Sequence, residues 1–202
     1  MTTTEAGPQG ATAAEDGTVP ASRSVGLALL VSGLLGAAAA AVLLVEKFAL
    51  LANPFHVPSC TLSAAVNCGA VMTSRQAEVL GFPNPLIGLA TLPVVAATGA
   101  AVLAGARMRP WFWIALASGS LIGWAFVCWL VVQSVFVIGA LCPYCVVVWV
   151  CVPVSALAAT SVIARAGRLP SALGTFAPSI AIAWVGALAV LVAGSLANLW
   201  GA

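Results

Sequence analysis

The sequence predicts an all-α integral membrane protein, and its composition and apolar runs carry that prediction. Of the 202 residues, 62% are hydrophobic and only 6% are charged, whereas soluble domains carry about 25% charged residues to hydrate their surface. Five apolar runs are each long enough to cross a hydrocarbon core of about 30 Å as a helix. The net charge of +2 comes from scattered residues, which argues against a nucleic-acid-binding protein because such proteins need a basic patch.

The first 24 residues are expected to form a disordered cytoplasmic tail. They are rich in Thr, Ala, Gly and Pro and carry three acids, so they have too few large apolar groups to build a core. Residues 25–45 follow without a single charge and are the first expected span. A cleaved signal peptide is the alternative, because the small residues 37–41 resemble a cleavage site. The apolar run is too long for a signal peptide, and the segment before it is acidic.

Four further spans are expected at residues 85–105, 111–140, 143–164 and 178–199. Pro93 and Pro153 fall inside two of these spans, where a membrane helix tolerates proline when neighbouring groups satisfy the freed backbone. No internal repeat is visible, so the inverted-repeat pattern of many transporters is missing.

The basic residues predict the orientation of the five spans. Five of the seven lie before the first span or in the connections after the second and fourth spans: Arg23, Arg107, Arg109, Arg165 and Arg168. The positive-inside rule places these residues in the cytoplasm. We therefore expect a multi-pass protein of the cytoplasmic membrane with a cytoplasmic N-terminus. The polar connection 46–84, which contains Lys47 and Arg75, is then expected outside.

This topology places four of the six cysteines on the outer, oxidising side of the membrane. Cys60 and Cys68 lie in the connection 46–84, and Cys142 and Cys145 form Cys-Pro-Tyr-Cys at the start of the fourth span. The other two, Cys128 and Cys151, are expected deeper in the lipid, where a thiol is usually a small packing group.

The Cys-Pro-Tyr-Cys sequence favours a redox-active pair. Cys142 and Cys145 lie on one face of the helix start, where the free amides and the helix dipole stabilise a thiolate, and proline suits this early position. A zinc site is less expected, because the eight-residue separation of Cys60 and Cys68 is unlike structural zinc spacing. An inert disulfide is less expected, because the bundle already constrains this helix end. Exchange between the two pairs would relay electrons from a protein outside to a small lipid-soluble acceptor such as a quinone.

These residues resemble the vitamin K epoxide reductase family, including its bacterial members that drive disulfide formation. The resemblance rests on Cys60 and Cys68, on Ser74 six residues later, on Asn84 in Asn-Pro-Leu-Ile-Gly, and on the Cys-Pro-Tyr-Cys motif after them. The other quinone-linked disulfide-forming family has the reverse order of the two cysteine pairs. The resemblance implies a four-helix bundle around a quinone over residues 25–164, covered by an exterior cap at 46–84. A fifth transmembrane helix in 165–202 has no expected chemical role.

The resemblance also implies a role for each site residue. Cys60 and Cys68 would be the shuttle pair, Cys68 would attack Cys142, and Cys145 would deliver electrons to the quinone. Ser74 and Asn84 would position the quinone carbonyl and stabilise charge on its oxygen. Two structural alternatives remain open, a Ser74 hydroxyl bonded to its own backbone and an Asn84 side chain that caps the following helix. No metal is implied.

Some bacterial relatives continue into a fused thioredoxin-like domain, whereas this chain is expected to use a separate thioredoxin-fold (DsbA-like) protein outside the membrane. The acceptor would be menaquinone, phylloquinone or ubiquinone. Reduction of vitamin K epoxide is the alternative activity, and a small transporter or membrane scaffold with structural disulfides is the alternative of another class. Trp149 stands where animal members often have Tyr, so anticoagulant sensitivity is not predicted.

The exterior cap is expected to contain one amphipathic helix over residues 68–80 that lies on the mouth of the bundle. Arg75 and Glu78 are three residues apart, where an exposed ion pair contributes little, and they are expected to form a solvated face. His56, the only histidine, is expected to be a polar lining residue of the Pro-rich loop before Cys60.

Overall fold

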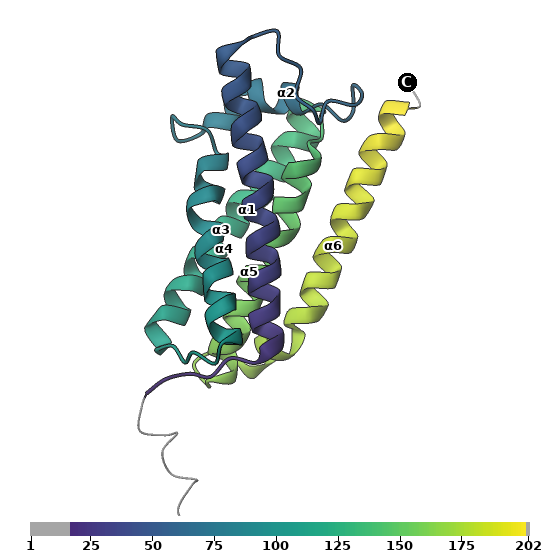
Figure 1. Cartoon of the computed structure of the whole chain (residues 1–202). Helices are drawn as coiled ribbons and strands as arrows, with labels where there is room; N and C mark the ends of the chain where they lie inside the picture. The colour runs from purple at the N-terminus through teal and green to yellow at the C-terminus, as the bar shows by residue number, and fades with distance from the viewer. Residues whose placement is uncertain (1–16, 201–202) are drawn as a thin grey trace, which may run out of the picture.

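The computed structural model describes residues 17–200, and Figure 1 shows a bundle of long helices with short elements at one end. The five long helices are α1 (Arg23–Ala52), α3 (Pro85–Leu103), α4 (Pro110–Val132), α5 (Pro143–Arg165) and α6 (Ser171–Trp200). The chain passes from α4 directly into a π-helical turn, η2 (Gln133–Ile138). All five long helices are apolar enough to cross a membrane, and the described residues form no sheet. The predicted all-α membrane class is confirmed.

Four of the helices form a bundle and the fifth lies outside it. α1 packs against α3 and α5, and α4 packs against α5. Although α3 and α4 are neighbours in the chain, their backbones do not pack closely against each other. α6 packs against α5 from outside, and in Figure 1 it stands to one side as the yellow helix. The prediction of a four-helix bundle with an additional helix is confirmed.

Two glycines allow the close approach of α1 and α3. A Cβ atom at Gly33 of α1 would overlap the backbone of Ala96, and one at Gly99 of α3 would overlap the backbone of Leu30. Small residues at such contacts let membrane helices gain packing energy that burial away from water cannot supply inside lipid.

The cap joins α1 to α3 and lies over one end of the bundle (Figure 1). It begins at residue 53 and not at 46, because α1 continues to Ala52 and the charged side chains of Glu46 and Lys47 find partners in the cap. The single helix expected over 68–80 is wrong. The structure has α2 (Cys68–Thr73) and a 3₁₀ helix, η1 (Arg75–Glu78), separated at Ser74, whose backbone is extended with φ −70° and ψ 153°.

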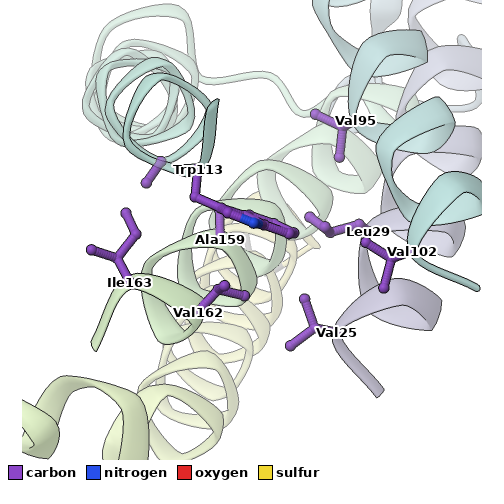
Figure 2. Close-up of a cluster of buried hydrophobic side chains, with 9 residues drawn as sticks. Val25, Leu29, Val95, Val102, Trp113, Ala159, Val162 and Ile163 are labelled. Carbon is purple, nitrogen blue, oxygen red and sulfur yellow. The ribbon is translucent and has the colours of Figure 1, made fainter. Parts of the chain in front are cut away.

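A core of apolar side chains joins the four bundle helices at the end opposite the cap. Figure 2 shows the indole of Trp113 reaching from α4 toward Leu29 of α1 and lying beside Ala159 of α5. Trp113 is only 1% exposed, and Val102 of α3 and Val162 of α5 belong to the same cluster. The centre of this end of the bundle is therefore filled by apolar side chains.

The described part of the expected tail is ordered against this core. The amide of Val19 donates a hydrogen bond to the carbonyl of Met108 at 2.9 Å, and the Ser22 hydroxyl caps α1 by accepting from the Val25 amide at 3.4 Å. Residues 1–16 of the expected tail lie outside the described residues. At the other end of the chain, α6 begins at Ser171, which is seven residues before the expected start of the fifth span.

Candidate active site

Backbone hydrogen bonds hold the two cysteine pairs beside each other. Cys68 begins α2, and Cys142 directly precedes α5 as its N-cap residue. The amide of Asn67 donates to the carbonyl of Leu141 at 3.0 Å, and the amide of Leu141 donates to the carbonyl of Ala65 at 2.8 Å. The residues immediately before Cys68 and Cys142 are thus bonded to each other, which brings the two cysteines to the same place.

The sulfur atoms form a compact buried group. Cys60 and Cys68 are joined in a disulfide, while Cys142 and Cys145 are free thiols. The Sγ atoms of Cys68 and Cys142 lie 3.1 Å apart, and those of Cys60, Cys68 and Cys142 all lie within 4.8 Å of one another. Thiol–disulfide exchange requires contact between an attacking sulfur and a disulfide sulfur, and this arrangement provides that contact.

The surroundings of Cys142 favour its thiolate. Hydrogen bonding from the Cys145 thiol is the largest influence and lowers the pKa of Cys142 below the ordinary value of 9.0; the amides of Cys145 and Tyr144 act in the same direction, while burial opposes them. A thiolate is the attacking form in disulfide exchange. The sulfur that faces the disulfide is therefore one that exists readily as a thiolate, which also makes it a good leaving group in exchange.

A cavity of about 860 Å³ lies between the cap and the bundle helices, and it is lined mainly by apolar side chains of α3, α4 and α5. Its volume falls within the range of about 300–1,000 Å³ typical of sites for small molecules. Polar side chains from α1, the cap, η2 and the start of α5 also line it: Lys47, Ser74, Gln76, Asn84, Gln133, Ser134 and Cys145. Side chains of both α3 and α4 line this cavity.

The two cysteines of the Cys-Pro-Tyr-Cys motif have different neighbours. Cys145 lines the cavity, whereas Cys142 does not and contacts Cys68 instead. Cys128 and Cys151 are free thiols that lie outside both the sulfur group and the cavity wall. The motif can therefore exchange with the cap disulfide on one side and react with a bound molecule on the other.

Ser74 and Asn84 both line the cavity, and both are held by the backbone of the cap. The Ser74 hydroxyl donates to the carbonyl of Val71 at 2.7 Å, which is the structural alternative considered for this residue. The Asn84 side chain does not cap α3. Its Nδ2 donates to the carbonyl of Gln76 at 2.7 Å, and its Oδ1 accepts from the amide of Val79 at 3.3 Å. An amide nitrogen has two donor hydrogens, so one remains for another partner.

Lys47 is a member of this site that sequence analysis treated only as a marker of topology. It is 8% exposed and lines the cavity. Its Nζ donates to the carbonyl of Met72 at 2.7 Å and pairs with Oε1 of Glu78 at 2.7 Å. Glu78, which was expected only on a solvated face, is therefore the ion-pair partner of Lys47. A charge within an apolar run was the available signal, since such charges usually mark functional sites.

Glu46, the residue before Lys47, bonds to the segment that precedes Cys60 of the disulfide. Its Oε2 lies 2.7 Å from Nε2 of His56, and its Oε1 accepts hydrogen bonds from the amide of Ser59 at 3.2 Å and from the Ser59 hydroxyl at 2.5 Å. His56 thus bonds to a specific carboxylate, beyond the lining role expected for it. Two adjacent charges of α1 anchor the segment before Cys60 and the segment after Cys68.

Comparison with known proteins agrees with this geometry. No curated protein matches the chain. Residues 27–161 match the model of the vitamin K epoxide reductase family, a stretch that runs from α1 into α5 and includes the cap, both cysteine pairs and the cavity. The family consists of membrane oxidoreductases that depend on quinones. Since the match covers two thirds of the sequence, the chain belongs to the vitamin K epoxide reductase family.

Proposed function

We propose that this protein reoxidises a separate thioredoxin-fold, disulfide-forming protein outside the cytoplasmic membrane and passes the electrons to a membrane quinone. The observation that carries the proposal is the division of the Cys-Pro-Tyr-Cys motif. Cys142 lies 3.1 Å from a sulfur of the cap disulfide, and Cys145 lines the cavity. The distribution of basic residues supports a cytoplasmic N-terminus with the cap outside.

The relay begins when the dithiol of the partner reduces the Cys60–Cys68 disulfide and itself becomes a disulfide. The Cys68 thiolate then attacks Cys142 of a Cys142–Cys145 disulfide, and the bond between these two sulfurs breaks with Cys145 leaving as a thiolate. Cys60 next attacks Cys68 and releases Cys142. The products are a Cys60–Cys68 disulfide and two free thiols at Cys142 and Cys145, which is the state of the cysteines in this structure.

The two thiols then reduce the quinone. Cys142 and Cys145 give up two electrons and two protons, the quinone becomes a quinol, and the disulfide between them forms again. Cys145 is the thiol that reacts with the quinone, because it is the member of the pair that borders the cavity. The apolar walls suit the ring, and a lipid-soluble tail would enter between α3 and α4, whose backbones do not pack closely against each other.

Polar groups of the cavity wall supply the hydrogen bonds that a reduced oxygen needs. Asn84 retains one amide hydrogen for the quinone oxygen, and the Ser74 hydroxyl can exchange its backbone partner for the same atom. The ammonium group of Lys47 adds a positive charge to this wall. Donors held in a water-poor site stabilise developing negative charge far better than they do in water.

The test uses purified protein under anaerobic conditions, a reduced thioredoxin-fold protein as donor, and menaquinone or ubiquinone as acceptor, with quinol followed by absorbance. We expect Cys142→Ser and Cys145→Ser to abolish quinol formation with any donor. Cys60→Ser and Cys68→Ser should abolish it with the protein donor and leave part of it with a small penetrating dithiol. Cys128→Ser and Cys151→Ser are the matched controls and should keep full activity.

Two results would contradict the proposal. Equal activity of all four site variants with the protein donor would exclude the relay. A Cys60–Cys68 disulfide that resists mild reductant, scored by subsequent thiol alkylation, would indicate a structural bridge and a protein without a redox cycle. Replacing the quinone with vitamin K epoxide in the same assay tests the alternative activity, reduction of the epoxide.

A further inference from the structure

A proline inside α5 leaves one backbone carbonyl without its usual donor. Pro153 has no amide hydrogen, so the carbonyl of Trp149, four residues earlier, loses the hydrogen bond that an α-helix would provide. Within a membrane protein such a group must find another partner, because lipid offers none. In this structure the indole Nε1 of Trp184 donates a hydrogen bond to the Trp149 carbonyl at 2.9 Å. Trp184 belongs to α6, so the outer helix replaces the missing amide of α5.

This replacement is specific to α5. Pro93 in α3 and Pro178 in α6 also lie inside helices, and they free the carbonyls of Leu89 and Gly174. Among residues 17–172 and 174–197, no side chain donates to either of these two carbonyls. A side-chain donor therefore does not accompany every proline inside a helix of this protein, and the bond from Trp184 to Trp149 needs its own explanation.

The residue that receives this bond forms part of the cavity wall. Trp149 is 3% exposed, lines the cavity, and lies one helical turn after Cys145. Leu188, one turn after Trp184 in α6, packs in the same apolar cluster as Trp149, and Cys145 lies against this cluster. α6 therefore supports the cavity wall from behind although it does not line the cavity itself.

The ring of Trp184 is also held by α4. Its ring and that of Trp124 meet edge to face, with centroids 5.5 Å apart and planes at 83°. Trp124 provides an internal comparison, because its own Nε1 is buried and has no hydrogen-bond partner among the described residues. The two indoles share one contact, yet only that of Trp184 bonds to the backbone of α5.

We propose that Trp184 is a positioning residue for the quinone site. By bonding to the carbonyl that Pro153 frees, it holds α5 in the conformation that sets the Trp149 side chain in the cavity wall. This inference rests on the proposed function, in which the cavity binds the quinone. It assigns a role to α6, which lies outside the family match over 27–161 and beside the bundle in Figure 1.

The experiment compares Trp184→Phe with Trp124→Phe in the quinone reductase assay. Trp184→Phe keeps an aromatic ring and removes the donor, and we expect it to raise the KM for quinone about three- to tenfold, in line with the loss of one buried hydrogen bond. The KM for the dithiol donor should stay unchanged, because the cap disulfide belongs to a different buried cluster from the one against which Trp184 packs. Trp124→Phe removes an N–H that bonds to nothing among the described residues and should leave both KM values as they are.

A rescue separates the hydrogen bond from ordinary packing. Pro153→Ala restores an amide that can donate to the Trp149 carbonyl within α5. In the Pro153→Ala background, adding Trp184→Phe should therefore change neither the KM for quinone nor the melting temperature. In the unaltered background, the same substitution should lower the melting temperature in detergent by roughly 2–4 °C relative to Trp124→Phe.

The outcomes distinguish this inference from the proposed function. An unaltered protein that reduces no quinone would overturn the proposed function, and with it any role of Trp184 at a quinone site. An active protein in which Trp184→Phe matches Trp124→Phe would overturn the positioning role alone. Equal effects of Trp184→Phe in the unaltered and the Pro153→Ala backgrounds would also overturn it, because the effect would then come from packing.

Discussion

The two ends of the bundle are built from the same helices but are held together in different ways. At the end opposite the cap, Trp113 and its apolar neighbours from α1, α3 and α5 fill the centre. At the cap end, a buried lysine and a carboxylate tie α1 to the cap, and the contact between Cys68 and Cys142 ties the cap to the start of α5. A cavity remains between the cap and the bundle helices. A closely packed end supplies stability, and it allows the other end to keep reactive thiols and an unfilled space.

Trp113→Ala should have the largest effect, a loss of stability at the packed end of the bundle. Removal of a buried aromatic side chain costs about 3–5 kcal/mol, because the surrounding structure closes the resulting cavity only in part. We therefore expect the melting temperature in detergent to fall by roughly 10 °C. The activity of the remaining folded protein, measured at low temperature, should be close to normal. Trp129→Ala, at a residue that is 38% exposed, is the matched control and should cost much less.

Lys47→Met should have the opposite effect at the cap end, with a large change in activity and a small change in stability. Lys47 is bonded to Met72 of α2 and Glu78 of η1, and α2 also carries Cys68. Loss of these contacts frees the cap to move Cys68 away from Cys142. Since hydrogen bonds to charged groups contribute about 1.5–3 kcal/mol, we expect electron transfer between the cysteine pairs to slow by at least about tenfold.

The control for Lys47→Met is Arg75→Met. Arg75 lies in the same cap and forms no ion pair with the described residues. Its substitution should leave the transfer rate unchanged, as measured by stopped-flow mixing of the reduced protein with quinone. Equal slowing in the two variants would show that Lys47 acts only through the overall charge of the cap.

The smallest expected effect is a shift in pH dependence. It tests the Cys142 thiolate, which is released in the last step of the proposed relay and attacks Cys68 in the reverse of that step. The pKa of Cys142 lies below 9.0, chiefly because of the Cys145 thiol. The thiolate is therefore present at lower pH than in an ordinary thiol, and exchange with Cys68 should slow as the pH falls through this lowered pKa. Cys145→Ala removes the donor and should move the profile to higher pH. Cys145→Ser keeps a hydroxyl donor and should move it less.

The measurement for this prediction is the formation of a disulfide between Cys68 and Cys142. In both Cys145 variants, attack of Cys142 on Cys68 releases Cys60, which an alkylating reagent traps for quantification by mass spectrometry. Identical profiles for Cys145→Ala and Cys145→Ser would show that the Cys145 side chain does not set the reactivity of Cys142.

Sequence analysis predicted the long helices well and the cap less well. Each span is a continuous apolar run, so its length and composition are sufficient to locate it. The cap depends on contacts that local pattern does not contain. The amphipathic pattern of 68–80 predicted one helix, but the break at Ser74 allows η1 to offer Glu78 to Lys47. For the same reason the end of α1 was placed before Glu46, whose partners in the cap let the helix continue to Ala52.

Within the site, too, sequence analysis identified the cysteines but not the contacts between them. Their spacing and their placement by charge bias selected the four thiols that lie at the cap end, and the roles implied for them, for Ser74 and for Asn84 stay predictions. Sequence alone left open whether Asn84 caps α3, because the shape of the turn before it could not be predicted. In the structure, the Asn84 side chain bonds to the backbone of Gln76 and Val79 in that turn. The support of α5 by α6 was also not predictable, although a proline inside a span already indicated a need for some partner.

By itself, the sequence determined that five helices cross a membrane and that two cysteine pairs belong to one side, because lipid requires long apolar runs and basic residues favour one face. Only the tertiary structure decided that Cys142 meets Cys68, 74 residues away in the chain, while Cys145 faces the cavity. It alone also decided that Lys47 holds the cap and that Trp184 completes α5. These contacts join elements distant in sequence, and their geometry follows from how the helices and the cap pack together.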